Sequence, residues 1–146
     1  MKGKKRHWLW NILIILAVIV SILSFMAHYK NWIWKKADRI QILSGIYYIE
    51  LPFNSMNNVS MVSKIPSLDR KNGFSAWEKE KGIFKDSLNE EKPVYIYVDN
   101  LNDQKIKLTY KDSLQLFINL SDSTKTKELY LYLDEKIGAQ QTQLKQ

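Results

Sequence analysis

The sequence predicts an α+β protein, in which an N-terminal single transmembrane helix precedes a small antiparallel β-meander domain with one helix. Three observations lead to this prediction. Residues 8–27 contain no charged side chain. Within residues 92–133, short runs place aliphatic residues at every second position. Residues 75–88 begin with a helix-capping pattern and carry apolar residues at the spacing of a helix. An all-β sandwich-like domain is the alternative, because short strand-like runs dominate the soluble part.

The apolar run of residues 8–27 is long enough to cross a membrane. As a helix with ~1.5 Å rise per residue it spans ~30 Å, the thickness of a bilayer's hydrocarbon core. It exceeds the ~7–15 residues typical of a signal peptide's apolar region. No small-x-small cleavage site closes it, since Phe25 stands two places before Ala27. We therefore expect a retained signal anchor.

Bases and amphipathic aromatics flank this run on both sides, as expected where a helix meets lipid headgroups. The basic flanking residues are Lys2, Lys4, Lys5, Arg6, Lys30, Lys35 and Lys36. The aromatic flanking residues are Trp8, Trp10, Trp32 and Trp34. Residues 1–7 are thus predicted to form a basic tail, and residues 28–37 an interfacial segment in contact with the lipid bilayer.

The short basic tail also decides the predicted orientation. Moving one positive charge outward costs ~2.3 kcal/mol per 100 mV of membrane potential, and four bases lie within residues 1–7. A long C-terminal domain, by contrast, crosses largely regardless of its charge. The sequence therefore predicts a cytoplasmic N-terminus and an extracytoplasmic domain over residues 38–137, in a bacterial inner membrane or cell membrane.

Small residues recur along one face of the predicted membrane helix. Spacings of four, three and four residues place them on that face: Ala17, Ser21, Ser24 and His28. Small side chains let a second helix approach closely, so helix–helix association in the membrane is one predicted interaction. We expect His28 itself to lie at headgroup level.

The formal net charge of +7 belongs to the membrane flanks. Residues 1–37 hold seven bases and no acid, whereas bases and acids balance over residues 38–146. A neutral domain offers no electrostatic footprint for phosphate backbones, so we expect no nucleic acid partner. The lack of cysteine excludes disulfides, thiolate metal sites and cysteine nucleophiles.

A hairpin and a long loop are predicted after the interfacial segment. Residues 39–43 and 45–51 are strand-like and pair across Ser44-Gly45. Residues 54–71 are polar and lack sustained periodicity, which indicates a loop.

A helix is predicted over residues 75–88. Ser75 and Glu78 make a capping box ahead of apolar residues at helical spacing, although Gly82 is unfavourable inside a helix. The polar segment 138–146 is predicted to be a disordered tail.

The remaining chain is predicted to form a meander of short strands. Residues 94–98, 106–110, 114–120 and 129–133 each alternate with a period of two, which sends successive side chains to opposite faces. Short polar turns between them favour antiparallel neighbours. The last run is the most ambiguous, because its leucines also fit a helical spacing.

Aromatic residues are predicted to gather on the face of the sheet opposite the aliphatic one. This face consists of Tyr95, Tyr97, Phe117, Tyr130 and Tyr132. It could stack on glycan rings or receive the apolar anchor of a partner protein. Alternatively, the predicted helix covers it, since a two-layer domain needs a cover for its sheet.

No catalytic, metal or cofactor signature is found. The only histidines are His7 and His28, both at membrane boundaries, so we expect no Ser-His pair and no histidine metal cluster inside the domain. Residues 99–103 begin like a calcium loop, but Leu101 stands at the third position and no glycine stands at the sixth.

The sequence therefore favours a non-enzymatic, membrane-anchored protein. Its neutral domain is expected to bind another envelope protein, as an accessory, assembly or inhibitor component. The alternative is a cell-wall or glycan-binding module that uses the tyrosine-rich face.

Overall fold

The computed structural model describes residues 5–86, 89–111 and 113–143. It begins with helix α1 (Lys5–Tyr29) and ends with helix α2 (Ser123–Gln143), with the short 3-10 helix η1 (Phe53–Ser55) between them. The strands are β1 (Asn31–Lys35), β2 (Arg39–Ser44), β3 (Tyr47–Pro52), β4 (Met56–Val62), β5 (Leu68–Ala76), β6 (Lys79–Asp86), β7 (Asn89–Val98), β8 (Lys105–Tyr110) and β9 (Leu114–Ile118). This arrangement confirms the predicted α+β class.

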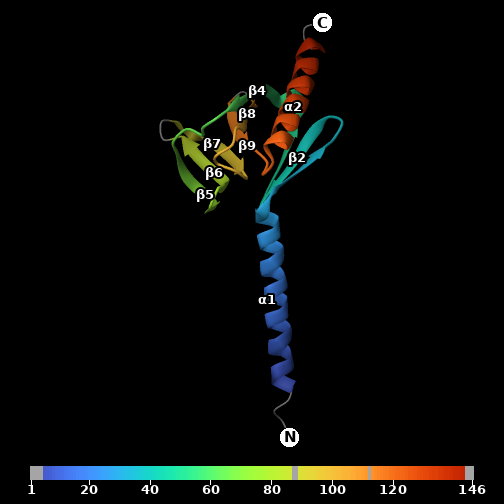
Figure 1. Cartoon of the computed structure of the whole chain (residues 1–146), viewed down its shortest axis with the longest axis vertical. Helices are drawn as coiled ribbons and strands as arrows, with labels where there is room; N and C mark the ends of the chain where they lie inside the picture. Colours follow the sequence, from blue (N-terminus) through green and yellow to red (C-terminus); the bar gives the residue numbers. More distant parts are fainter. Residues whose placement is uncertain (1–4, 87–88, 112, 144–146) are drawn as a thin grey trace.

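Helix α1 extends alone from one end of the domain (Figure 1). Its segment His7–Tyr29 is long and apolar enough to cross a membrane, and its apolar side chains are exposed along the whole length. Such exposure is unfavourable in water and favourable in lipid.

The first sheet is an antiparallel set in the order β1-β2-β3. It confirms the predicted hairpin of residues 39–43 with 45–51, with the turn at Gly45 and Ile46. The left-handed backbone of Gly45, with φ of 64°, suits this tight turn. Strand β1 was not predicted: α1 ends at Tyr29, and much of the expected interfacial segment pairs with β2 instead.

The second sheet has the order β4-β8-β9-β7-β6-β5. All its neighbours are antiparallel except β7 and β9, which are parallel. The predicted simple meander is therefore wrong between β7 and β8, because β9 lies between them. The physical reason is Asn119, directly after β9, whose side-chain amide bonds to the backbone of Asp99, Asn100 and Gln104. These bonds hold the β7–β8 connection across the end of β9.

The predicted loop 54–71 and helix 75–88 are both wrong, because these segments form η1 and strands β4, β5 and β6. Strands β5 and β6 form a hairpin in which Gly73 pairs with Gly82. A side chain at either glycine would collide with the opposite backbone, so the two strands approach unusually closely. Gly82 thus suits the close pairing of two strands, whereas the same glycine inside a helix would be destabilising. Leu88, the last apolar residue of the predicted helix, lies outside the described residues.

The predicted strand 129–133 belongs to helix α2, so the alternative helical spacing is the right one. Thr126, Leu129, Leu133 and Ile137 are buried along one face of α2. The helix continues to Gln143, so the predicted disordered tail is helical as far as the structure describes it.

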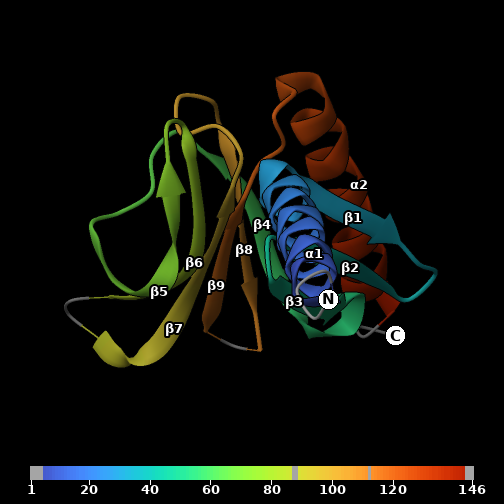
Figure 2. The ribbon, with the colours of Figure 1, turned by 90° about the horizontal axis from the view of Figure 1, so that it is seen from below.

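Two apolar clusters cover opposite faces of the six-stranded sheet. The larger cluster lies beneath α2 and the three-stranded sheet, which share one side of the larger sheet (Figure 2). The smaller cluster lies on the other face and includes Phe84, Val94, Ile96, Val98 and Phe117. That second face has no helix over it in the described chain, and the candidate site lies there.

Candidate functional site

The predicted aromatic face does not form, because Phe117 lies on the opposite face of the sheet and the four tyrosines pack in or against the larger core. Tyr97 pairs with Ile118 in the parallel β7–β9 ladder, so these two share a face and Phe117 points to the other. Tyr97 and Phe117 are each only 1% exposed. Tyr130 and Tyr132 lie on α2, not on a strand.

The tyrosines of β7 instead belong to the larger core. The rings of Tyr97 and Tyr47 stack with centroids 6.1 Å apart, and Tyr95 meets Tyr97 edge to face at 6.2 Å. Burial raises the pKa of the Tyr97 hydroxyl above its ordinary value, because the phenolate would lack water around it. These residues are structural, and no exposed stacking platform of the five exists.

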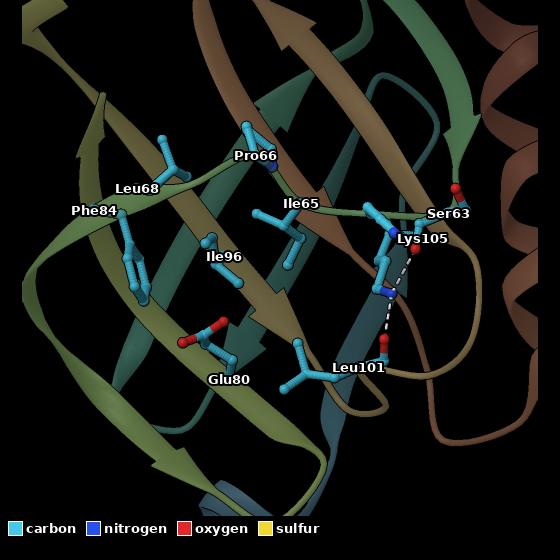
Figure 3. Close-up of a pocket in the computed structure, with 10 residues that line it drawn as sticks. Ser63, Ile65, Pro66, Leu68, Glu80, Phe84, Ile96, Leu101 and Lys105 are labelled. Carbon is cyan, nitrogen blue, oxygen red and sulfur yellow. Dashed lines mark hydrogen bonds between the residues drawn. The ribbon is translucent and has the colours of Figure 1, made fainter. Parts of the chain in front are cut away.

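A pocket of about 280 Å³ opens on the other face of the six-stranded sheet. Its wall combines the β4–β5 connection, strands β6 and β7 and the β7–β8 connection (Figure 3). Its lining mixes apolar residues, namely Ile65, Pro66, Leu68, Phe84, Ile96 and Leu101, with the polar or charged Ser63, Lys64, Glu80 and Lys105. Sequence reasoning missed this pocket, because its residues come together only through strand pairing.

Lys105 forms one wall of this pocket and ties its two connections together. Its ammonium donates to the backbone oxygens of Leu101 and Ser63 at 2.5 and 3.0 Å, the two dashed lines in Figure 3. Burial lowers the pKa of Lys105, since the charged form loses hydration. Lys105 therefore links the β4–β5 and β7–β8 connections by hydrogen bonds and so fixes the shape of the pocket.

A carboxylate lies at the other side of the pocket. Glu80 accepts from the Arg70 guanidinium at 3.4 Å, and this guanidinium lies 5.8 Å from the ring centre of Phe84. Charged residues therefore lie beside the apolar residues of the pocket.

The junction between α1 and the domain is a buried polar network. The Asn31 side-chain amide donates to the backbone oxygens of Tyr97 and Asn119 at 2.6 and 2.8 Å. The Asn31 backbone N–H donates to Asp99 at 2.9 Å, and the same carboxylate pairs with Lys81. The first residue of β1 is thus bonded into the larger sheet, so α1 is joined firmly to the domain.

The predicted membrane flank is only partly described. Lys2 and Lys4 lie outside the described residues, whereas Lys5 and Arg6 begin α1. Trp8 and Trp10 are exposed on α1, and Lys30 follows it directly. Trp32, Trp34 and Lys35 lie in β1 rather than in a helical extension, and Lys36 directly follows this strand.

The predicted helix-packing face contacts the domain at its C-terminal end. Ser21 donates to the Ala17 carbonyl at 2.8 Å, and His28 is hydrogen-bonded to the Ser24 carbonyl at 2.7 Å. The ring of His28 lies 5.3 Å from that of Phe74 in β5. Phe74 of the same chain therefore contacts the C-terminal end of the small-residue face.

The geometry of the pocket limits its chemistry. Both histidines lie on α1, and among the described residues no three His, Cys, Asp or Glu side chains gather in a way that could hold a metal ion. A volume of about 280 Å³ is at the lower end of small-molecule sites, which span ~300–1,000 Å³. It suits one or two apolar side chains.

The fold and site define an α+β domain with an apolar surface pocket, joined to a helix that could span a membrane. No family model, no curated protein and no solved structure matches this chain significantly.

Proposed function

We propose that this protein is a single-pass membrane protein whose domain, on the extracytoplasmic side, docks a segment of another envelope protein in the pocket beside Lys105. It acts as a non-enzymatic accessory, assembly or inhibitor component. The observation that carries the proposal is the pocket itself, a hollow that fits one or two side chains and combines apolar lining residues with charged ones.

The size of the pocket favours a protein partner over a small-molecule substrate. Protein interfaces concentrate their binding energy in a few apolar anchors that enter pockets of this kind, with polar contacts around them. Fully burying one large apolar side chain contributes ~1.5–3 kcal/mol. The Glu80–Arg70 pair and the exposed Lys64 of the β4–β5 connection supply polar contacts at the rim of the pocket.

Edge strand β5 supports the same proposal. Among the described strands it pairs with β6 alone and is mostly exposed, so its outer edge could add a partner's extended segment beside the pocket. Asp69, Arg70 and Lys71 on this strand are charges of the kind that discourage unspecific strand pairing. A specific partner would therefore need matching charges.

A photocrosslinking experiment in membranes of the source cells tests this function. A benzoylphenylalanine in place of the exposed Pro66, at the pocket rim, should give one discrete adduct with another membrane or envelope protein. Leu68→Trp, which fills the pocket, should abolish this adduct and copurification of the same protein. Leu131→Trp, at an exposed position on α2, is the matched control and should preserve both.

The opposite results would contradict the proposal. If Leu68→Trp folds and retains both adduct and copurification, the pocket is not the docking site. If the benzoylphenylalanine gives no protein adduct in these membranes, the docking function itself fails.

A further inference from the structure

Two turns of the domain lie beside the end of α1. The backbone N–H of Gly45, in the β2–β3 turn, donates to the carbonyl of Ala27 at 3.2 Å. Ala27 is the last residue of the apolar run, so this turn lies at the level where that run ends. The next residue, Ile46, is 72% exposed.

The β5–β6 hairpin reaches the same level from another direction. Phe74 lines a hollow together with residues of the last turns of α1, namely Val20, Ser21, Ser24, Phe25 and His28. The ammonium of Lys79, just after the hairpin turn, lies 5.0 Å from the ring centre of Tyr29. In Figure 1 the end of β5 that carries this turn points toward the side from which α1 leaves.

The tip of this hairpin carries an unusual residue. Trp77 is 87% exposed, the largest exposed fraction among the large apolar residues of the described chain. Its backbone has φ of 50°, a left-handed conformation that bulky residues rarely adopt. An exposed indole on a turn with a strained backbone points to a contact outside the fold.

We propose that Ile46, Phe74 and Trp77 insert into the headgroup boundary of the bilayer that α1 spans. This inference rests on the membrane-spanning part of the proposed function. The occupant is lipid because the hairpin lies against the part of α1 that the bilayer must surround. Tryptophan is enriched at this depth, where its apolar body and its N–H both find partners. Lys30 is exposed directly after α1, where it can meet lipid phosphates, whereas the half-buried Lys79 donates to the Asp99 backbone oxygen at 3.4 Å.

Membrane contact at these turns also positions the pocket. The backbone N–H of Leu101, a pocket residue, donates to the Glu78 carbonyl in the hairpin turn at 2.7 Å, and Asn102 donates to the Glu78 side chain at 3.1 Å. One pocket wall is therefore bonded to the inserted tip. With α1, the two turns hold the domain at three points, so the pocket keeps a constant height and direction above the membrane.

Single-tryptophan variants of the full chain test this inference. The other four tryptophans, Trp8, Trp10, Trp32 and Trp34, are replaced by Phe, and the protein is reconstituted into vesicles of phosphatidylethanolamine and phosphatidylglycerol. Trp77 should then show blue-shifted emission and lose most of it when the lipids carry bromine near the headgroup end of their acyl chains. Aqueous iodide should quench it weakly.

Two matched variants separate the possible failures. A variant that keeps only Trp34, which β1 carries away from the end of α1 and from the headgroup region that the sequence predicted for it, should be quenched by iodide and not by bromolipid. A variant that keeps only Trp10 should be quenched by bromolipid if α1 is inserted. Quenching of Trp10 combined with a water-exposed Trp77 would overturn the hairpin inference and leave the membrane span intact.

Two other results would also overturn it. If bromolipid quenches neither Trp10 nor Trp77, the membrane-spanning proposal fails together with the inference. If Trp77 is accessible to iodide in vesicles but protected in membranes of the source cells, its contact is a protein rather than lipid. Unchanged near-ultraviolet circular dichroism of the tyrosines confirms that each variant is folded.

Discussion

The side-chain ammonium of Lys81 lies 2.8 Å from the Asp99 carboxylate, and the two side chains are only 0% and 1% exposed. Burial lowers the pKa of Lys81, and the nearby Asp99 partly offsets this effect. The other oxygen of Asp99 accepts from the backbone of Asn31 at 2.9 Å. This buried pair therefore lies between the larger sheet and the segment that leaves the membrane helix.

Replacing Lys81 by Met should destabilise the domain strongly. The Asp99 carboxylate would remain buried without its cation, and breaking one side of a buried ion pair costs about 3–5 kcal/mol. Lys85→Met, on the same strand, should stay within ~0.5 kcal/mol of the unchanged protein. Urea unfolding in mild detergent measures both, and equal midpoints for the two variants would refute a structural role of the pair.

Replacing Asn31 by Ala should loosen the join between α1 and the domain. The backbone oxygen of Asn119 would lose a buried donor, and an unsatisfied buried group costs ~1–3 kcal/mol, whereas the Tyr97 oxygen keeps the Asn119 backbone N–H at 3.3 Å. Amide hydrogen exchange in β1 should become faster. Asn58→Ala, at an exposed position in β4, is the control and should leave exchange in β1 unchanged. A protected β1 in Asn31→Ala would contradict the assigned bonds.

Two glycine substitutions should change stability in opposite directions. Ala at Gly82 would press its methyl group against the backbone of Asn72 and Gly73, so β5 and β6 would have to separate. Ala at Gly138 meets nothing within 4 Å and should stabilise α2 by up to ~1 kcal/mol. Thermal unfolding measures both shifts. A stable Gly82→Ala variant would show that the hairpin tolerates a wider spacing.

Alkaline pH should destabilise the domain partly through Tyr97. Its pKa is raised by burial from an ordinary value of 10.0, so above that pH the unfolded chain loses the proton first. This contribution is complete below about pH 10 and falls by up to ~1.4 kcal/mol per pH unit above it. Urea midpoints between pH 8 and 11 should fall less for Tyr97→Phe than for the unchanged protein. Tyr29→Phe, at an exposed ring, should behave like the unchanged protein.

The proposed orientation predicts the location of the C-terminus. A reporter enzyme that is active only outside the cytoplasm should be active when fused after Gln146 and inactive when fused before Met1. The physical reason is the cluster of bases ahead of Trp8, which resists outward transfer. A stable but inactive C-terminal fusion would reverse the topology.

The pattern of nearby residues was enough to predict the features that depend on interactions between neighbours in the chain. The apolar run became the helix ending at Tyr29, and the first three of the four alternating runs correspond to parts or whole lengths of β7, β8 and β9. The turn at Gly45 also followed from sequence. In each case the physical cause, apolar length, period-two alternation or a left-handed glycine, acts within a few residues.

The errors arose where distant residues compete with local preference. Ser75 and Glu78 read as a helix cap, yet Gly73 and Gly82 bring two backbones so close that a hairpin forms instead. The run around Leu129 read as a strand, yet a helix places Leu129, Leu133 and Ile137 together on the core. Burial of apolar surface outweighs propensities worth fractions of a kcal/mol per residue.

The sequence alone thus determined the apolar helix, the α+β class and most of the sheet strands after residue 92, because their causes are local. The strand order, the pocket beside Lys105 and the Lys81–Asp99 pair were not determined in this way. They depend on contacts between distant segments, such as the Asn119 bonds to the β7–β8 connection and the parallel β7–β9 register, which places Tyr97 and Phe117 on opposite faces. Pairing between strands remote in the chain is a property of the packed molecule, and no short segment encodes it alone.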